Sequence, residues 1–217
     1  MEASSVRRIL IVEDHEVFRL GIKELIEHEP DLVVCGEADN VKDALALIDA
    51  VRPDMVIVDI TLKNGNGMDL IRTVCQHPLP PRMLVLSMHD ELLYAQRCLK
   101  AGAHGYIMKQ ETSRSIIKAI RRILSGDIYV SDQLVGSILK RVQSGREPVT
   151  PAPTEALSDR ELDVLRMIGQ GKSTSEIASA MNLSVSTIGT YRERIKEKLN
   201  LKNAAELVRY AVHWVDG

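Results

Sequence analysis

The stretch of sequence that decides the fold reads Met55-Val56-Ile57-Val58-Asp59, a short apolar run that ends on an acidic residue. Similar runs occur elsewhere in the first half of the chain, at Ile9–Val12, Leu32–Cys35, Met83–Leu86 and Tyr106–Met108. These runs are short, rich in β-branched residues and not alternating with polar ones. We therefore expect strands that are buried on both faces, as in a parallel sheet.

Segments with a helical spacing of apolar residues separate these runs. They lie at residues 17–26, 41–48, 68–74, 92–99 and 116–124. Strand and helix thus alternate five times within about 120 residues. We predict a doubly wound α/β domain over residues 6–126, with a five-stranded parallel sheet and right-handed crossovers.

The pattern changes after Ser125-Gly126. Residues 131–143 can form one amphipathic helix through Leu134, Ile138, Leu139 and Val142. The segment 144–153 holds three prolines among polar residues, which is typical of an extended linker. We assign residues 127–153 to a linker that contains a helix at 131–143.

Residues 154–217 are predicted to form a separate all-α domain of four helices. Helix start signals occur at Ser158 with Glu161, Ser173 with Glu176, Ser184, and Asn203 with Glu206. Apolar residues at helical spacing follow each signal. The third of these helices runs to about Leu199 and the last one through Trp214.

Composition limits the classes of function only weakly. The chain has 217 residues, a formal net charge of −2 and 3% aromatic residues, so its cores must be aliphatic and its charge does not indicate nucleic acid. It shows no signal peptide and no apolar stretch long enough to cross a membrane. Cys35, Cys75 and Cys98 are widely spaced without a CxxC motif. We expect a cytoplasmic protein with reduced cysteines and no membrane partner.

Polar residues follow four of the predicted strands: Glu13 and Asp14, Asp59, Ser87, and Lys109. Because the carboxyl ends of parallel strands meet at one edge of a sheet, we expect these side chains to converge. Clustered carboxylates repel one another and need a cation, and a hard site of oxygen ligands suits Mg²⁺. Asp59 is the central candidate nucleophile, which would form an aspartyl-phosphate, while Lys109 and Ser87 would bind phosphoryl oxygens.

Each of these residues also has an ordinary interpretation. An aspartate after a strand is usually a turn former or a helix cap, and a lysine is usually a solvated surface residue. Only their joint placement at four strand ends favours a phosphoryl site.

Residues 6–125 resemble the receiver domain of bacterial two-component response regulators, which has a flavodoxin-like fold. The matching motifs are Ile11–His15, Val58-Asp59, Leu86-Ser87 and Gly105–Lys109. The resemblance implies that Asp59 is the phosphoacceptor and that a histidine kinase is the phosphoryl donor.

The resemblance also implies a magnesium site and a switch. Asp14, Asp59 and the backbone carbonyl of Thr61 would ligate Mg²⁺, with Glu13 acting through a water molecule. Ser87 and Tyr106 match the family's switch pair, although Tyr106 can also be read as a half-buried strand residue. Two departures, which affect loop dynamics and phosphoryl lifetime, are the absence of proline in residues 63–67 and Gln110 after the lysine.

Residues 157–215 resemble the helix-turn-helix domain of LuxR/NarL/FixJ-type regulators. The match includes residues 157–161, Gly171, 176–178, 183–188 and 198–199. On a helix over 184–199, one face carries Val185, Ile188, Ile195 and Leu199. The N-terminal part of the opposite face is expected in the DNA major groove.

The candidate DNA contacts are Lys172, Ser184, Ser186, Thr187, Thr190, Tyr191, Arg194 and Lys198. Lys172, Arg194 and Lys198 suit phosphate, and the hydroxyls suit base edges or phosphate. Gly189 and Glu193 stand where this family frequently carries lysine, so the target sequence is left open. Residues 192–202 taken alone could be a solvated helix face.

The last helix has more apolar residues than one face requires: Leu207, Val208, Ala211, Val212, Trp214 and Val215. The surplus favours a homodimer contact, which a target with two half-sites would need. A fully buried terminal helix is the alternative.

These observations favour a two-component response regulator, in which phosphorylation of Asp59 controls sequence-specific DNA binding and transcription. It is not expected to be an enzyme. The enzyme alternative is a phosphatase or phosphotransferase with an aspartyl nucleophile, but residues 60–64 offer no second carboxylate and no cap insertion is present. A binding module that no longer depends on phosphorylation is a third hypothesis. The presence of Asp14, Asp59, Ser87 and Lys109 argues against it.

Overall fold

The computed structural model describes residues 6–62, 66–88, 91–143, 153–181 and 183–216. The chain divides into two compact units, residues 1–144 and 145–217. Lys63–Gly65 of the loop after Asp59, residues 144–152 of the predicted linker and Asn182 of the predicted turn lie outside the described residues. No helix in the described part of the chain combines the length and the apolar character that a membrane span requires.

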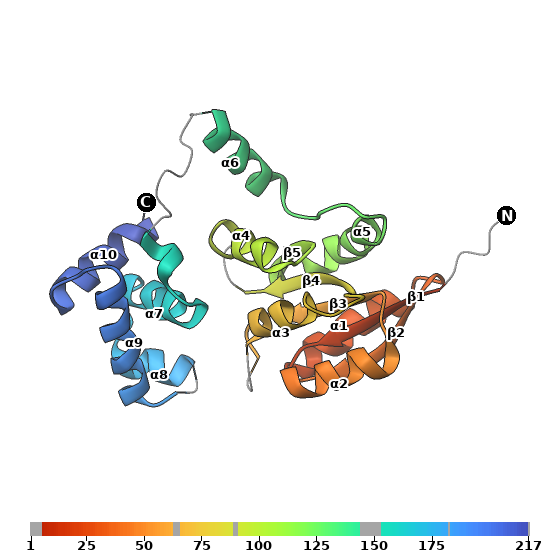
Figure 1. Ribbon diagram of the computed structural model, residues 1–217, viewed down its shortest axis with the longest axis horizontal. Helices are drawn as coiled ribbons and strands as arrows, with labels where there is room; N and C mark the ends of the chain where they lie inside the picture. The colour runs from red at the N-terminus through yellow and green to blue at the C-terminus, as the bar shows by residue number, and fades with distance from the viewer. Residues whose placement is uncertain (1–5, 63–65, 89–90, 144–152, 182, 217) are drawn as a thin grey trace. The chain divides into compact units, whose positions relative to one another are not determined.

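The first unit is built on a five-stranded parallel sheet in the order β2-β1-β3-β4-β5 (Figure 1). The strands are β1 (Arg7–Val12), β2 (Leu32–Ala38), β3 (Met55–Asp59), β4 (Arg82–Ser87) and β5 (Gly105–Met108). Every residue of β3 is buried, which agrees with the apolar run Met55–Val58 that precedes Asp59. The predicted parallel sheet is confirmed.

Helices cover both faces of the sheet. They are α1 (Glu16–Glu27), α2 (Val41–Val51), α3 (Gly67–Val74), α4 (Glu91–Ala101) and α5 (Thr112–Leu124), with a 3₁₀ turn η1 (Lys109–Glu111) before α5. Helices α1 and α5 pack against each other, and α3 packs between α2 and α4. On the face of α1 and α5, Ile22, Ile26, Ile116 and Ile120 pack into the aliphatic core. The doubly wound fold is therefore confirmed.

The segment after α5 returns to the sheet before it forms helix α6 (Asp132–Gln143). The backbone N–H of Tyr106 donates to the carbonyl of Tyr129 at 2.9 Å, and the N–H of Tyr129 donates to the carbonyl of His104 at 3.0 Å. The carboxylate of Glu91 on α4 accepts from the N–H of Ser131 at 2.8 Å and also from its hydroxyl. Residues 129–131 are thus bound to β5 and α4, and α6 matches the helix predicted at 131–143.

The described residues of the second unit, 153–181 and 183–216, form only helices and turns: the 3₁₀ turn η2 (Pro153–Ala156), α7 (Asp159–Gly169), α8 (Thr174–Ala180), α9 (Val185–Lys198) and α10 (Ala204–Asp216). Both predicted capping boxes form, at Ser158 with Glu161 and at Ser173 with Glu176. The side chains of Ser184 and Asn203 accept the N–H groups of Thr187 and Glu206, as helix caps do. The core includes Leu165, Ile177, Ile188, Ile195 and Leu207, which are all fully buried.

The apolar residues that share one face of α9 differ in burial. Val185 is 53% exposed, whereas Ile188 and Ile195 on the same side of α9 are fully buried. Val185 is the first residue of the helix. Helical periodicity shows which residues lie on the same face of a helix. It does not show at which turn that face stops packing against the neighbouring helices.

Candidate phosphoacceptor and DNA-binding sites

Acidic side chains gather where β1 and β3 end. These two strands are neighbours, and the order of the sheet reverses between them, which is where ligands bind in this class of fold. Asp59 is the last residue of β3, and Glu13 and Asp14 follow β1. Carboxylate oxygens of the three residues all lie within 4.8 Å of one another. Glu13 is 1% exposed and Asp59 4%, so two of these charges are held away from water.

Lys109 brings a positive charge into this cluster from the end of β5. Its Nζ lies 2.8 Å from Oδ2 of Asp59 and 2.7 Å from Oε2 of Glu13. The same ammonium lies 4.8 Å from the centre of the Phe18 ring, within the range of a cation–π contact. Buried carboxylates are tolerated only when they are paired, and Lys109 pairs with both of the buried ones.

The environment shifts the pKa values of this pair. Burial raises the pKa of Asp59 to about 6, although the ammonium of Lys109 opposes that shift. Burial lowers the pKa of Lys109, but the carboxylates of Asp59 and Glu13 outweigh it and leave that pKa above its ordinary value. At neutral pH the pair is therefore a carboxylate and an ammonium.

Of the other predicted receiver residues, Ser87 and Thr61 lie at the same edge of the sheet, and Tyr106 lies within β5, paired with Val85. Ser87 ends β4 and is fully buried. The ring of Tyr106 on β5 is 1% exposed, so the half-buried alternative does not describe it. The N–H of Thr61 donates to Oδ1 of Asp59 at 3.0 Å, which helps to orient the carboxylate.

Two positioning residues of this site were missed in the sequence. A Cβ atom at Gly67 would lie 2.1 Å from the carbonyl oxygen of Asp59, so only glycine allows α3 to begin this close to β3. The N–H of His15 donates to Oε1 of Glu13 at 3.0 Å, and its Nδ1 accepts the N–H of Phe18 at 3.3 Å as the N-cap of α1. A glycine at a helix start and a histidine before one were the only local signals.

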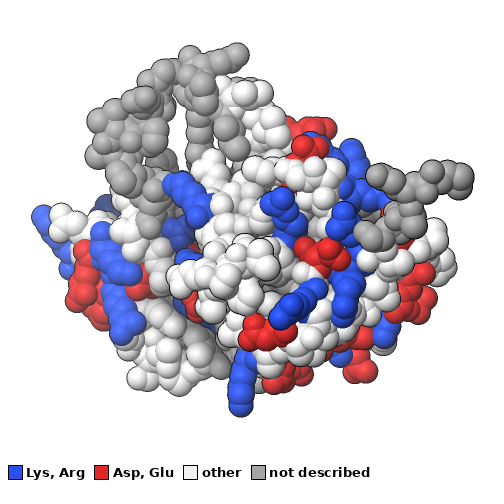
Figure 2. All heavy atoms as spheres, turned by 45° about the vertical axis from the view of Figure 1, so that its right-hand side comes forward, with Lys and Arg blue, Asp and Glu red and all other residues white. Residues whose placement is uncertain are grey.

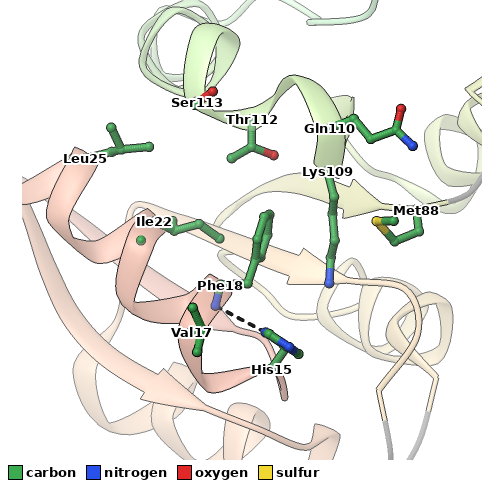
Figure 3. Close-up of a pocket in the computed structure, with 11 residues that line it drawn as sticks. His15, Val17, Phe18, Ile22, Leu25, Met88, Lys109, Gln110, Thr112 and Ser113 are labelled. Carbon is green, nitrogen blue, oxygen red and sulfur yellow. Dashed lines mark hydrogen bonds between the residues drawn. The ribbon is translucent and has the colours of Figure 1, made fainter.

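An apolar pocket of about 810 Å³ borders the acidic cluster through Lys109 (Figure 3). It lies between α1 and the start of α5, and Phe18 and Lys109 point toward each other on its wall. Its lining residues are His15, Val17, Phe18, Gly21, Ile22, Leu25, Met88, Lys109, Gln110, Thr112 and Ser113. Val17 is 74% exposed and the nearby Leu20 50%, which is unusual for large apolar side chains.

In the second unit, helices α8 and α9 form the helix-turn-helix. The hydroxyl of Ser184 caps α9 and lies 2.7 Å from the hydroxyl of Thr187. The hydroxyl of Thr190 donates to the carbonyl of Ser186 at 3.2 Å, so it is bound to its own helix. Ser186 and Arg194 are exposed, as is Lys172 before α8, while Tyr191 is half-buried.

Lys198 differs from the other candidate DNA contacts because it binds a carboxylate. Its Nζ lies 2.7 Å from Oε2 of Glu161, which is 2% exposed on α7. Glu193 forms an ion pair with Lys196 at 2.8 Å. Figure 2 shows basic and acidic side chains interspersed over the face that it presents, so no extended surface of positive charge is seen on that face.

Helix α10 buries one face and exposes another. Leu207 and Ala211 are fully buried, whereas Val208 is 41% exposed and Val212 and Val215 are each 38% exposed. The three exposed valines follow helical spacing and form one apolar stripe. The alternative of a fully buried helix is therefore excluded within this unit.

Models of known protein families match both units. The model for the response regulator receiver domain matches residues 9–121, and that for the luxR family of bacterial regulatory proteins matches residues 155–211. This chain belongs to the response regulators with a LuxR-type DNA-binding domain. This family consists of transcription regulators under phosphorylation control rather than of typical enzymes.

Characterised relatives align with this response regulator along nearly its whole length. It is 34% identical over 205 residues to BvgA of Bordetella pertussis, named for positive transcription regulation of virulence factors, with 94% of this chain and 96% of that one covered. It is 30% identical over 205 residues to the response regulator UvrY of Escherichia coli, covering 94% and 93% of the two chains.

Solved structures show the same folds. A LuxR-family response regulator from an Aurantimonas species is 32% identical, with a TM-score of 0.60, and covers 64% of this chain and 99% of its own. RcsB of Salmonella enterica, solved on the rprA promoter with a phosphomimetic, is 23% identical with a TM-score of 0.61, covering 95% and 98%. At that identity the second likeness concerns the fold alone.

Proposed function

We propose that Asp59 is the phosphoacceptor of this response regulator, that a histidine kinase is its donor and that the phosphorylated protein binds DNA as a homodimer. The observation that carries this proposal is the convergence of three carboxylates, Lys109 and Ser87 at one edge of the sheet. A buried aspartate with a paired lysine can attack phosphorus while the lysine accepts the charge that develops.

The proposed reaction is a phosphoryl transfer to a carboxylate. An oxygen of Asp59 forms a bond to phosphorus, and the bond from phosphorus to the histidine nitrogen of the kinase breaks. Lys109, now 2.8 Å from Oδ2 of Asp59, passes to a phosphoryl oxygen. The hydroxyl of Ser87 donates to another phosphoryl oxygen. The regulator has no separate substrate to turn over, and so it acts as a switch rather than as an enzyme.

Mg²⁺ fits this site by the chemistry of its donors. Asp14, Asp59 and the carbonyl of Thr61 would hold the ion, and Glu13 would act through a water molecule. Three carboxylates with oxygens within 4.8 Å of one another are hard anionic ligands of the kind that Mg²⁺ prefers. When bound, the ion would neutralise the charge of the transferring phosphoryl group.

Ser87 and Tyr106 are proposed as the switch. Both are buried on neighbouring strands: Ser87 ends β4, and Tyr106 lies on β5 two positions before the residue that pairs with Ser87. Movement of the serine hydroxyl toward a phosphoryl group would change the space beside the ring. The N–H of Tyr106 is bound to Tyr129, at the beginning of the segment that leads to α6. A change at Tyr106 can therefore reach the segment that connects the two units.

The pocket between α1 and α5 is the proposed docking surface for the kinase. A donor histidine must reach Asp59, which is only 4% exposed, and this pocket borders the site through Lys109. Its apolar lining and the exposed Val17 suit an apolar helix face of a partner protein. Val17→Ser should slow transfer from the kinase and leave phosphorylation by acetyl phosphate unchanged.

The proposed DNA surface is formed by the start of α9 and by Lys172. The N-terminal half of α9 would enter the major groove, and it carries Ser186, Thr187, Thr190 and Tyr191, with Ser184 as its cap. Arg194 and Lys172 would contact phosphate. The exposed valine stripe of α10 would form the homodimer contact. Since bacterial DNA is cytoplasmic, the regulator would act there.

The test is incubation of the full chain with Mg²⁺ and acetyl phosphate, followed by intact-protein mass measurement and DNA retardation. We expect one phosphoryl adduct and tighter DNA binding, both lost in Asp59→Asn and with a chelator. Asp69→Asn is the matched control, because Asp69 is an exposed aspartate of α3 in the same unit. If no adduct forms and DNA binding is unchanged by phosphodonor, the phosphoacceptor proposal is wrong.

A further inference from the structure

We infer that Lys198 is a positioning residue, which orients the recognition helix through Glu161 and does not contact DNA phosphate. The inference rests on the proposed DNA-binding role of α9. Lys198 is the last residue of α9, and its Nζ lies 2.7 Å from Oε2 of Glu161 on α7. The contact joins the C-terminal end of one helix to the N-terminal turn of another.

Glu161 is held in place from two sides. It is 2% exposed, and Oε2 accepts both the ammonium of Lys198 and the backbone N–H of Ser158 at 2.7 Å. The N–H of Glu161 in turn donates to the hydroxyl of Ser158 at 3.4 Å, which completes the capping box of α7. Lys198 is therefore bound to a group whose own position is fixed.

The charge on Glu161 depends on this contact. Burial raises the pKa of the Glu161 carboxyl, but Lys198 and Ser158 outweigh burial and keep that pKa below its usual range. A buried carboxylate without a counter-charge is strongly disfavoured. If the ammonium moved to a DNA phosphate, Glu161 would lose the charge that compensates it.

The geometry of α9 explains why this contact matters for recognition. A helix of 14 residues is about 21 Å long, and the groups proposed to enter the groove lie at its N-terminal end. Ile188 and Ile195 are buried along its length, and Lys198 holds the far end against α7. Release of that end changes the angle at which the first turn of α9 meets the groove.

Arg194 provides the matched comparison. It lies one turn earlier on the same helix and is exposed, as Lys198 is (39% of its side chain), but it forms no ion pair with any residue that the structure describes. A phosphate contact there adds to the salt dependence of DNA binding, because each contact releases counterions. A positioning contact between two protein groups does not.

The experiment compares full-length Lys198→Gln, Glu161→Gln, their double variant and Arg194→Gln on one DNA duplex over a range of KCl concentrations. We expect Lys198→Gln and Glu161→Gln each to weaken binding about tenfold, with an unchanged salt slope. The double variant should be no weaker than either single variant. Arg194→Gln should instead reduce the salt slope by about 1. Lys198→Arg, which keeps the charge, should restore binding.

The effect of Glu161→Gln on DNA affinity has opposite signs for a positioning role and for a phosphate contact of Lys198. If Lys198 contacted phosphate, Glu161→Gln would free the lysine and tighten binding, and Lys198→Gln would reduce the salt slope. Either result overturns the inference.

A measurement on the unmodified protein covers the case in which a variant fails to fold. Acylation of lysines, read by peptide mass, should leave Lys198 poorly reactive with and without DNA. Lys172, which is exposed and a proposed phosphate contact, should react in the free protein and be protected by DNA. A Lys198 that reacts freely and is protected only by DNA refutes the positioning role.

If the wild type binds no DNA at all, the proposed function fails. The reactivity of Lys198 in the free protein then still decides whether its contact with Glu161 exists.

Discussion

The proposed phosphoacceptor site is buried in the receiver domain, whereas the proposed DNA surface of the helix-turn-helix domain is exposed. Glu13 and Asp59 expose 1% and 4% of their surface, while Ser186 and Arg194 are open to solvent. A phosphoryl transfer gains from fixed charges in a medium of low polarity, because their interaction is weakly screened there. Recognition of DNA needs groups that can reach the partner.

The two domains also differ in the role of a paired lysine. Lys109 forms ion pairs with two carboxylates in the receiver, and Lys198 forms an ion pair with one in the DNA-binding domain. In the receiver, the lysine is part of the site that would carry out the reaction. In the DNA-binding domain, the lysine lies at the C-terminal end of α9, away from the end that would enter the groove. Changes to buried charges should therefore alter reactivity or shape, and changes to exposed groups should alter binding alone.

The largest expected effect is that of Lys109→Met on phosphorylation. Loss of the only ammonium bound to Asp59 among the described residues removes a charge that would stabilise the transferring phosphoryl group. The rate of adduct formation with acetyl phosphate should fall about 100-fold. Lys172→Met, at an exposed lysine of the other unit, should leave that rate unchanged. A loss of less than about threefold in Lys109→Met would contradict the proposed role.

The second effect concerns pH and Mg²⁺. Because burial raises the pKa of Asp59 to about 6, protons compete with the cation below that pH. Mg²⁺ affinity should fall roughly tenfold per pH unit below about 6 and level off above it, as calorimetry can measure. Asp59→Asn should bind Mg²⁺ weakly, without this transition near pH 6. A flat profile in the wild type would show that Asp59 does not set metal affinity.

A smaller effect is expected at the cap of α9. The side chain of Ser184 accepts the N–H of Thr187 at 3.0 Å, so Ser184→Ala should cost about 1 kcal/mol in the unfolding of the DNA-binding domain. Trp214 is the single tryptophan of the chain, so its fluorescence reports on this domain. Ser186→Ala, two residues on and exposed, should change that free energy by less than about 0.5 kcal/mol. Equal losses of unfolding free energy in Ser184→Ala and Ser186→Ala would mean that the helix cap does not stabilise the domain.

The smallest effect on folding is expected at the valine stripe. Val212 is 38% exposed, so Val212→Ser should change unfolding by less than about 0.5 kcal/mol. The same variant should weaken the homodimer of the phosphorylated protein in sedimentation. The matched control is Val33→Ser, because Val33 on β2 of the receiver is equally exposed. Sedimentation unaffected by Val212→Ser would remove α10 as the dimer contact.

Much of the receiver site could be predicted because its pattern is local. Parallel strands joined by crossover helices all point the same way, so residues that directly follow them, such as Asp14, Asp59 and Lys109, must meet at one edge. The caps of the C-terminal helices are equally local, since Ser158, Ser173 and Ser184 bond within three residues of themselves. The exposed apolar residues of α10 were also predictable, because the helix has more apolar residues than one buried face can hold.

The partners of side chains over long distances could not be predicted in this way. The sequence alone determined two domains, an acidic edge and a recognition helix. Tertiary structure decided that Lys198 binds Glu161, 37 residues earlier, that Phe18 lies beside Lys109, and that Val185 is exposed. Periodicity and capping depend on neighbours within a few residues. Which charge a lysine meets, and where packing ends along a helix, depend on how separate elements come together in space.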